Sequence, residues 1–398
     1  MSTRKIIHLD LDAFFCAVEE LRQPDLRGKP FAVGGRPNER GVVSSCSYAA
    51  RQCGVHSAQP MAQALRLCPD LLVVAPNQDA YREMSVQVMA ILHDWTGLVE
   101  QLSIDEAFLD VSDLPQPGLE LARALQSQIR DRLGLPCSLG VATNKLVAKT
   151  ATDVGKGKHR GSTPPSAVEV VPPGQEAAFL APLSAQALWG VGPKTAARLA
   201  ELGIHTIGDI ARLPDAVLAR QFGQAGREMG QHARGIDERP VVPERSARSI
   251  SQEVTFDRDV SNPDYLYDTL RKLSEEVARS LRQKDLCAGT IRLKLRWPDF
   301  TTLSRQVSFD QPVDQDRIIY EAALSLFSSV WTVGRAVRLS GVGAARLVES
   351  AHQLTLWDTP DQKERRLLDA LDTLRERFGD DIVRSGRTLK KPGRAKKL

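Results

Sequence analysis

Two adjacent carboxylates in an otherwise apolar run constrain the fold of this chain more than any other feature. Asp105 and Glu106 stand in the strand-like segment 103–110. A second acidic site, Asp10, lies at the end of the apolar segment 6–12. Neighbouring carboxylates repel one another unless a cation lies among them. If the two segments pair in one sheet, Asp10, Asp105 and Glu106 converge.

Three oxygen ligands without matching His or Cys suit Mg²⁺ or Mn²⁺ better than zinc. A site that holds two such ions about 3.5–4 Å apart can activate an attacking oxygen and neutralise a leaving phosphate. Acidic residues at strand ends are more often solvated, or cap a turn. The surrounding motifs favour the catalytic interpretation.

The segments 8–15 and 103–110 together resemble the two metal-binding motifs of the Y-family translesion DNA polymerases, most closely those of the DNA polymerase IV type. The resemblance implies a multidomain α+β right-hand fold with a palm, small fingers, a helix-hairpin-helix thumb and a βαββαβ little finger. It also implies low-fidelity copying of damaged or undamaged template from dNTPs on primer-template DNA, without proofreading.

The chain has 398 residues, enough for two to four units with separate cores. We expect the palm at 1–24 and 77–165, the fingers at 25–76, the thumb at 166–238, a linker at 239–248, the little finger at 249–347 and a tail at 348–398.

The resemblance assigns roles to the residues around the acidic motifs. Asp10 and Asp105 bridge two Mg²⁺ ions, Glu106 completes the site of the ion that activates the primer 3′-hydroxyl, and the Leu11 carbonyl helps to bind the other ion. The aromatic pair Phe14 and Phe15 follows. As the resemblance implies, Phe15 packs beneath the sugar of the incoming nucleotide and excludes a 2′-hydroxyl.

The resemblance implies that three further residues bind the triphosphate. Tyr48 and Arg51 are three apart and share a face of a helical turn, so both can reach one anion. Lys156, in the basic loop 153–161, is our choice for the triphosphate-binding lysine. Relatives place proline after that lysine, whereas this chain has Gly157, so Lys158 is the alternative.

The preceding helix, from about residue 145, offers two more cations. Lys145 and Lys149 are one turn apart, and we expect them on the helix surface, available for phosphate or simply solvated. Either Thr143 or Asn144 caps the start of this helix.

Two regions are expected to hold DNA. The segment 188–199 resembles a helix-hairpin-helix, in which glycine-rich backbone and a helix N-terminus grip a phosphate. Its predicted contacts are Gly190, Gly192, Lys194 and Thr195.

In the little finger, the residues 291–296 alternate between apolar and basic, which places the basic ones on the open face of a sheet. The predicted phosphate contacts are Arg292, Lys294, Arg296 and Arg338. A polar face is also normal for any half-exposed sheet.

The segment 353–357 resembles the peptide that attaches bacterial polymerases to the sliding clamp. Its recognition residues are Gln353, Leu354, Leu356 and Trp357. An amphipathic stretch at 367–378 and a basic end follow.

The hydrophobic share of 42% and charged share of 26% are typical of a globular protein, and the net charge is only +4. We expect a cytoplasmic monomer, because no apolar run could cross a membrane and no signal-peptide pattern is present. The six cysteines form no Cys-x-x-Cys pair.

Two alternatives to a polymerase are another palm-type nucleotidyl transferase or cyclase, and an inactive clamp-associated relative that still binds DNA.

Overall fold

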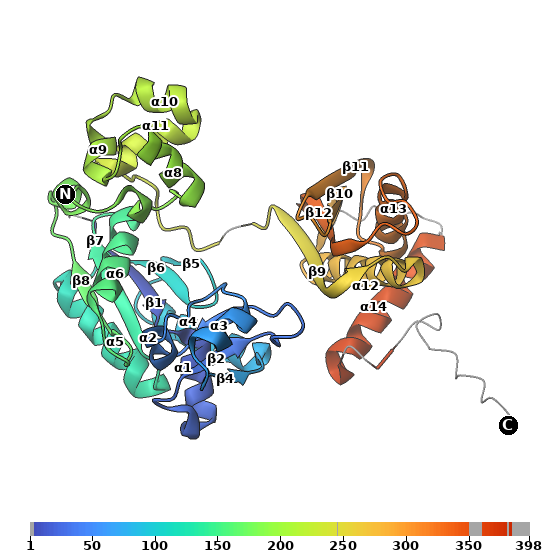
Figure 1. Ribbon diagram of the computed structural model, residues 1–398, viewed down its shortest axis with the longest axis horizontal. Coiled ribbons are helices and arrows are strands. Elements are labelled where there is room, and N and C mark those ends of the chain that lie inside the picture. The colour runs from blue at the N-terminus through green and yellow to red at the C-terminus, as the bar shows by residue number, and fades with distance from the viewer. Residues whose placement is uncertain (1–3, 245, 350–359, 380–381, 384–398) are drawn as a thin grey trace. The chain divides into compact units, whose positions relative to one another are not determined.

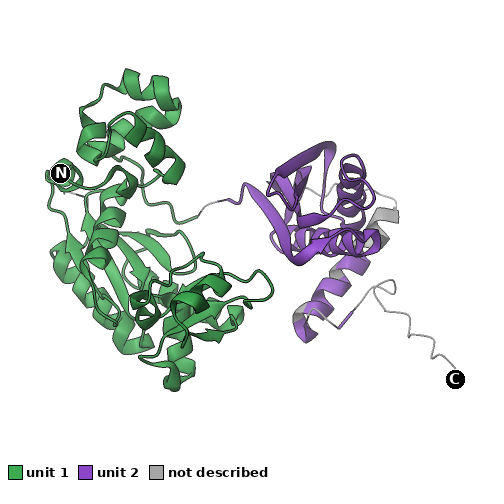
Figure 2. Ribbon diagram, in the orientation of Figure 1, with its two compact units in different colours: residues 1–245 green, residues 246–398 purple. Residues whose placement is uncertain are grey.

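The structure is a computed structural model that describes residues 4–244, 246–349, 360–379 and 382–383 (Figure 1). The chain divides into two compact units, residues 1–245 and 246–398 (Figure 2). The division falls inside the segment 239–248 that the sequence predicts as a linker.

The first unit is built on a five-stranded sheet in the order β5-β6-β1-β7-β8. Its strands are β1 Ile6–Leu11, β5 Val99–Gln101, β6 Glu106–Asp110, β7 Cys137–Ala142 and β8 Val168–Val170. β1 pairs antiparallel with β6 and with β7, whereas β7 and β8 run parallel. This sheet is the predicted palm, but β8 carries it past residue 165, because a three-residue strand is too short to recognise from its pattern.

Helices cover both faces of the palm sheet. They are α1 Phe14–Arg22, η1 Pro24–Leu26, α4 Gln78–His93, α5 Gly118–Leu133 and α6 Lys145–Lys158. Ile7 and Leu9 of β1 share a core with α4 and α5, whereas Ile6 shares a core with α6. A strand that is covered on both sides has no exposed positions, which explains the near-continuous apolar run of β1.

The predicted fingers form a small three-stranded sheet in the order β3-β2-β4. Its elements are β2 Phe31–Gly34, β3 Val43–Cys46, α2 Tyr48–Gln52, α3 Met61–Leu67 and β4 Leu72–Val74. The predicted thumb is helical, with α7 Glu176–Leu180, η2 Ala185–Ala187, α8 Pro193–Glu201, α9 Ile207–Arg212, α10 Asp215–Phe222 and α11 Gln224–Ala233.

The second unit confirms the predicted βαββαβ order. Its elements are β9 Ser249–Val260, α12 Pro263–Arg282, β10 Leu286–Arg296, β11 Thr302–Val313, α13 Asp316–Ser328 and β12 Val337–Glu349. The strands form one antiparallel sheet in the order β11-β10-β12-β9, and α12 and α13 share its apolar core. One face of the sheet therefore remains open to solvent.

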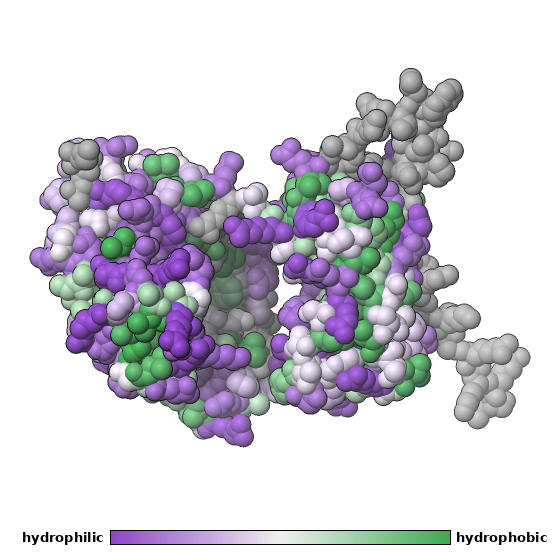
Figure 3. Space-filling model, turned by 90° about the horizontal axis from the view of Figure 1, so that it is seen from above, coloured by the Kyte–Doolittle hydropathy of each residue, from purple (hydrophilic) through white to green (hydrophobic). Residues whose placement is uncertain are grey.

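The amphipathic stretch of the tail is helix α14 Pro360–Phe378. Arg282 of α12 holds it through Asp372, with Nε 2.7 Å from Oδ2. The clamp-binding-like residues Gln353, Leu354, Leu356 and Trp357 lie outside the described residues. No helix in the described ranges is both long and apolar enough to span a membrane. On the face that Figure 3 presents, hydrophobic residues form small clusters among hydrophilic ones.

Candidate active site

The β1–β6 pairing brings the two acidic segments together, as the sequence predicts. Asp10 stands opposite Glu106 in the register of the two strands. β6 begins at Glu106, so Asp105 lies in the turn before it, where its carbonyl accepts a hydrogen bond of 3.0 Å from the Leu11 amide. Residues almost a hundred positions apart in the sequence therefore lie at one edge of the palm sheet, where β1 ends and β6 begins.

A cavity of about 300 Å³ opens at this edge. Its lining includes Asp10, Leu11, Phe14, Phe15, Arg51, Asp105 and Lys156. Seven of the nine residues predicted for catalysis, metal binding and nucleotide binding thus surround one space, whereas Glu106 and Tyr48 are not part of its lining. Phe14 is buried and Phe15 is half-buried.

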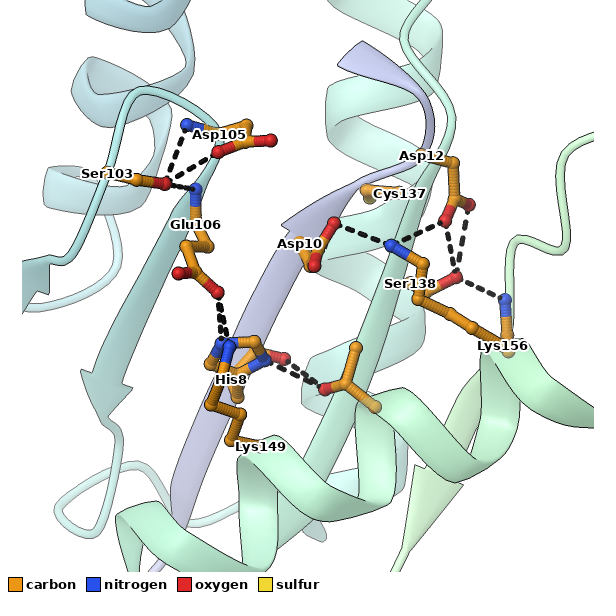
Figure 4. A network of polar contacts seen from close by, with 12 residues as sticks. His8, Asp10, Asp12, Ser103, Asp105, Glu106, Cys137, Ser138, Lys149 and Lys156 are labelled. Carbon is orange, nitrogen blue, oxygen red and sulfur yellow. Dashed lines mark hydrogen bonds and ion pairs between the residues drawn. The ribbon is translucent and has the colours of Figure 1, made fainter. Parts of the chain in front are cut away.

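The carboxylates are held apart by separate partners (Figure 4). Lys156 Nζ lies 2.6 Å from Asp10 Oδ1 and 3.4 Å from Asp12 Oδ1. Lys149 Nζ contacts Glu106 Oε2. Among the described residues, no group of three His, Cys, Asp or Glu side chains is gathered into a metal cluster. The predicted strand pairing is confirmed, but the side chains do not converge as closely as expected.

The contacts of the two lysines are accompanied by shifted pKa values of Lys156 and Glu106. Burial alone would lower the pKa of Lys156, but Asp10 and Asp12 outweigh it and raise that pKa to about 12. Hydrogen bonding by His8, together with Lys149, lowers the pKa of Glu106 to about 2. Lys156 and Glu106 are therefore both held in their charged forms.

Asp105 has a different environment, because no cationic side chain among the described residues forms an ion pair with it. Its Oδ1 accepts a hydrogen bond of 2.6 Å from the Ser103 hydroxyl. Burial raises the pKa of Asp105, the Ser103 hydrogen bond opposes this shift, and the charges of Asp10 and Glu106 raise the pKa further. A carboxylate whose charge is disfavoured by burial and by like charges gains from a divalent cation. The oxygen donors at this edge therefore fit Mg²⁺ or Mn²⁺ by type.

His8 supports Glu106 from inside the palm and was missed by the sequence analysis. The ring is fully buried, with Nδ1 2.9 Å from Thr152 Oγ1 and Nε2 3.3 Å from Glu106 Oε2. Burial lowers the pKa of His8, so the ring is neutral at pH 7. An isolated histidine in an apolar strand gives no sequence signal of this contact.

Asp12 is a second residue whose importance the sequence did not reveal. Its carboxylate is fully buried and accepts hydrogen bonds from the Ser138 hydroxyl, at 2.9 and 3.0 Å, and from the Ser166 amide at 3.0 Å. Because it also contacts Lys156, Asp12 holds that ammonium at the cavity. Its position two residues after Asp10 was the only available signal.

Tyr48 and Arg51 share one face of α2, as predicted, with the guanidinium 4.7 Å from the ring centroid. The buried Tyr48 hydroxyl has no hydrogen-bond partner in the described part of the chain. Burial raises the pKa of Tyr48 to about 12, so the hydroxyl keeps its proton. An unpaired buried donor is expected to serve a ligand, because leaving it unpaired is costly.

The two candidate lysines for the triphosphate lie in different places. Lys156 lines the cavity, whereas Lys158 pairs with Glu169 and is 63% exposed. Both belong to the last turns of α6, which continues through the segment 153–158 that the sequence predicted as loop. The helical spacing between them turns the two side chains in different directions.

The expectation that Lys145 and Lys149 lie on a solvated surface was wrong. Lys145 is 2% exposed and lies 2.8 Å from Glu100, which is 1% exposed. Spacing showed that the two lysines share a face of α6, but not that this face packs against the sheet. Asn144, and not Thr143, caps the helix by accepting a hydrogen bond from the Val147 amide.

The predicted DNA contacts are exposed or half-exposed. Gly190 has a φ of 99°, which favours glycine, and Gly192 caps α8 with Lys194 and Thr195 in its first turn. In the second unit, Arg292, Lys294 and Arg296 alternate with the buried residues of β10. Arg338 lies with its guanidinium 4.2 Å from the Phe300 ring centroid.

Family models match three parts of the chain. Residues 9–153 match the impB/mucB/samB family, residues 247–356 match the C-terminal domain of that family, and residues 186–237 match the DNA polymerase-iota thumb domain. The last two ranges contain every predicted DNA contact in the two units.

Relatives match over nearly the whole chain. DNA polymerase IV of Desulfatibacillum aliphaticivorans is 40% identical over 96% of both chains. DNA polymerase IV of Alkalilimnicola ehrlichii is 41% identical, over 90% of this chain and 100% of its own. DNA polymerase IV 1 of Bacillus subtilis is 37% identical, over 98% of this chain and 94% of its own.

A solved structure is similar as well. The Y-family DNA polymerase chimera Dbh-Dpo4(243-245)-Dbh matches with a TM-score of 0.76 at 26% identity, covering 87% of this chain and 99% of its own. The similarity covers the right-hand architecture expected from the sequence.

Proposed function

The chain belongs to the Y-family of DNA polymerases, in the DNA polymerase IV group, and from this premise we propose that Asp10, Asp105 and Glu106 form its catalytic centre. The chain is a DNA-directed DNA polymerase of the translesion type. We propose that it copies damaged and undamaged template with low fidelity and without a proofreading exonuclease. The observation that carries the assignment is the pairing of Asp10 with Glu106, next to Asp105, at the edge of a cavity.

The three carboxylates and the Leu11 carbonyl would hold two divalent cations, Mg²⁺ by preference and Mn²⁺ as an alternative. When bound, these ions activate the primer 3′-hydroxyl and neutralise charge on the phosphates of the nucleotide. The support for this proposal is the type of the donors, all of them oxygen, and the electrostatic environment of Asp105.

The side chains around the cavity bind the nucleotide. Lys156 of α6 and Arg51 of α2 line the cavity. The Tyr48 ring lies 4.7 Å from the Arg51 guanidinium, and its hydroxyl is an unpaired donor among the described residues. A triphosphate that enters this cavity would meet two cations, and Tyr48 offers a further donor close to Arg51. Phe15, also in the lining, is the residue proposed to exclude a 2′-hydroxyl, with Phe14 packed behind it in the core.

The thumb residues Gly190, Gly192, Lys194 and Thr195 and the open sheet face of the second unit are proposed to hold primer-template DNA. Exposed amides at a helix N-terminus and rows of cations contact phosphate without reading sequence. We further propose a cytoplasmic monomer that attaches to a sliding clamp through Gln353, Leu354, Leu356 and Trp357. The support for the clamp contact is one glutamine for polar recognition and two apolar anchors.

The alternatives are less favoured. A nucleotide cyclase would need neither the thumb nor the C-terminal sheet, and both match polymerase-family domains. An inactive relative would have no need for Asp10 opposite Glu106 on paired strands, with Asp105 in the adjoining turn.

Primer extension with one dNTP at a time tests the proposal. Extension should require Mg²⁺ and follow the template, and Asp105→Ala should abolish it. Asp131→Ala is the control, because that exposed carboxylate lies on α5 and pairs with its neighbour Arg130. Extension without a divalent cation, or in the Asp105→Ala protein, would contradict the assignment.

A further inference from the structure

Tyr81 of α4 contacts helix α1 through both its ring and its hydroxyl. Its ring stacks on Phe15 with centroids 4.2 Å apart and an interplanar angle of 11°. Its hydroxyl donates a hydrogen bond of 2.8 Å to Glu19 Oε1. Phe15 and Glu19 are four residues apart, so they share one face of α1, and Tyr81 lies along that face.

Glu19 is itself fixed. Its side chain is 1% exposed, and its two oxygens each lie 3.2 Å from Arg22 Nη1. Gln23 donates a longer hydrogen bond of 3.4 Å to the same carboxylate. A buried carboxylate is tolerated when its oxygens accept several hydrogen bonds, so displacing the Tyr81 hydroxyl would leave a buried acceptor unsatisfied.

Tyr81 has little room to move as well. It is fully buried in the palm core, and burial raises the pKa of its hydroxyl, which therefore stays protonated and donates to Glu19. Phe15, by contrast, is half-buried and lines the cavity beside Asp10 and Asp105. One side of the Phe15 ring thus meets the cavity, and the stacked Tyr81 ring supports it from the protein interior.

We propose that Glu19 is a positioning residue for sugar selection, which acts by fixing Tyr81 as the rigid support of the Phe15 ring. The inference rests on the proposed role of Phe15 in excluding a 2′-hydroxyl. An aromatic ring that can swing to another rotamer admits a slightly larger sugar, whereas a ring supported by a hydrogen-bonded neighbour stays in place. Glu19 is not part of the cavity lining, so it influences selection only through Tyr81.

Single-turnover incorporation of a dNTP and of the matching rNTP tests this directly. Tyr81→Phe keeps the stacked ring and removes only the hydroxyl, so the preference for dNTP should fall by roughly tenfold. Glu19→Leu should have the same effect, whereas Glu19→Gln still offers an acceptor and should retain most of the preference. Tyr320→Phe, on α13 of the second unit, is the matched control and should change nothing.

The ratio of the two efficiencies separates positioning from general damage. If Tyr81 and Glu19 merely stabilise the palm, dNTP and rNTP incorporation will fall together and the ratio will stay constant, which overturns the inference. Thermal unfolding of each variant identifies a protein that has lost its fold, and Tyr81→Phe keeps the test open if Glu19→Leu does not fold.

Phe15→Ala separates this inference from the proposed function. If Phe15→Ala admits ribonucleotides but Tyr81→Phe and Glu19→Leu do not, the support by Glu19 is refuted and the role of Phe15 stands. If Phe15→Ala leaves sugar selection unchanged, both statements are wrong.

Discussion

The edge of the palm sheet and the open face of the second sheet both carry charged side chains, but these side chains differ in their exposure to solvent. At the palm edge, Lys156 is 21% exposed and its partner Asp10 is 20% exposed. On the open face, Lys294 is 37% exposed and its partner Glu253 is 47% exposed. Arg292 and Arg296 nearby are bonded to the neutral groups of Gln306 and Thr302.

This difference predicts two kinds of behaviour. Interactions between partly buried charges are strong and depend on each partner, because little water screens them. Interactions between exposed charges are weak, nearly independent and reduced by salt. We therefore expect single substitutions in the palm to have large effects, and those on the open face to have small effects that depend on salt.

Breaking the buried Lys145–Glu100 pair should have the largest effect. Lys145→Met removes the cation 2.8 Å from the buried Glu100 carboxylate, and should lower the free energy of unfolding of the first unit by about 3–5 kcal/mol. Denaturant unfolding measures this change. The double variant with Glu100→Leu should recover part of the loss, since it removes both charges. A loss below about 1 kcal/mol for Lys145→Met would make this pair equivalent to an exposed one, and would contradict the expected difference between the two regions.

Removing the cavity lysine should have the next largest effect. Lys156→Met should reduce kcat/KM for dNTP incorporation by roughly 100-fold, because the cavity loses the cation that we propose binds the triphosphate. The matched control is Lys158→Met, which removes an exposed lysine that pairs with Glu169. A larger loss in the control would assign the triphosphate to Lys158.

The junction between α6 and the end of the thumb should show a smaller, pH-dependent effect. Burial alone would raise the pKa of Asp237, but hydrogen bonds from Arg239 and the Leu146 amide outweigh it and lower that pKa. A lowered pKa stabilises the fold above the unfolded pKa of about 3.9, and this contribution is lost as pH falls below about 4. Asp237→Asn should therefore cost about 1 kcal/mol at pH 7, since Arg239 is half exposed and screened, and less at pH 3. A difference that stayed constant between pH 7 and pH 3 would contradict this account.

On the open face, a single cation should have the smallest effect. Lys294→Met should weaken DNA binding only a few-fold and reduce the slope of log K against log salt by about 0.9. Glu253→Gln, which removes the partner of Lys294, should strengthen binding. An unchanged salt slope in Lys294→Met would mean that this lysine meets no phosphate.

The sequence predicted those features that depend on local periodicity and on pairs of motifs. The alternation through Arg292, Lys294 and Arg296 predicted their face of the sheet correctly. The apolar segments ending at Asp10 and continuing from Glu106 predicted a strand pairing that the structure confirms. In both cases the information lies within a few consecutive residues.

Features that depend on distant partners could not be predicted. The roles of His8 and Asp12 arise from contacts with Thr152 on α6, Ser138 on β7 and the Ser166 amide, all more than a hundred residues away. The burial of Lys145 depends on Glu100 in another strand. Helical spacing relates residues of one helix to one another, but not to the surface that the helix meets.

Anomalous diffraction from Mn²⁺ tests the central claim most directly, in crystals of the enzyme with primer-template DNA and a non-hydrolysable dNTP. The account predicts two peaks about 3.5–4 Å apart among Asp10, Asp105 and Glu106, with the Lys156 ammonium moved from Asp10 to the triphosphate. Peaks confined to other sites, with Lys156 still bound to Asp10, would contradict it.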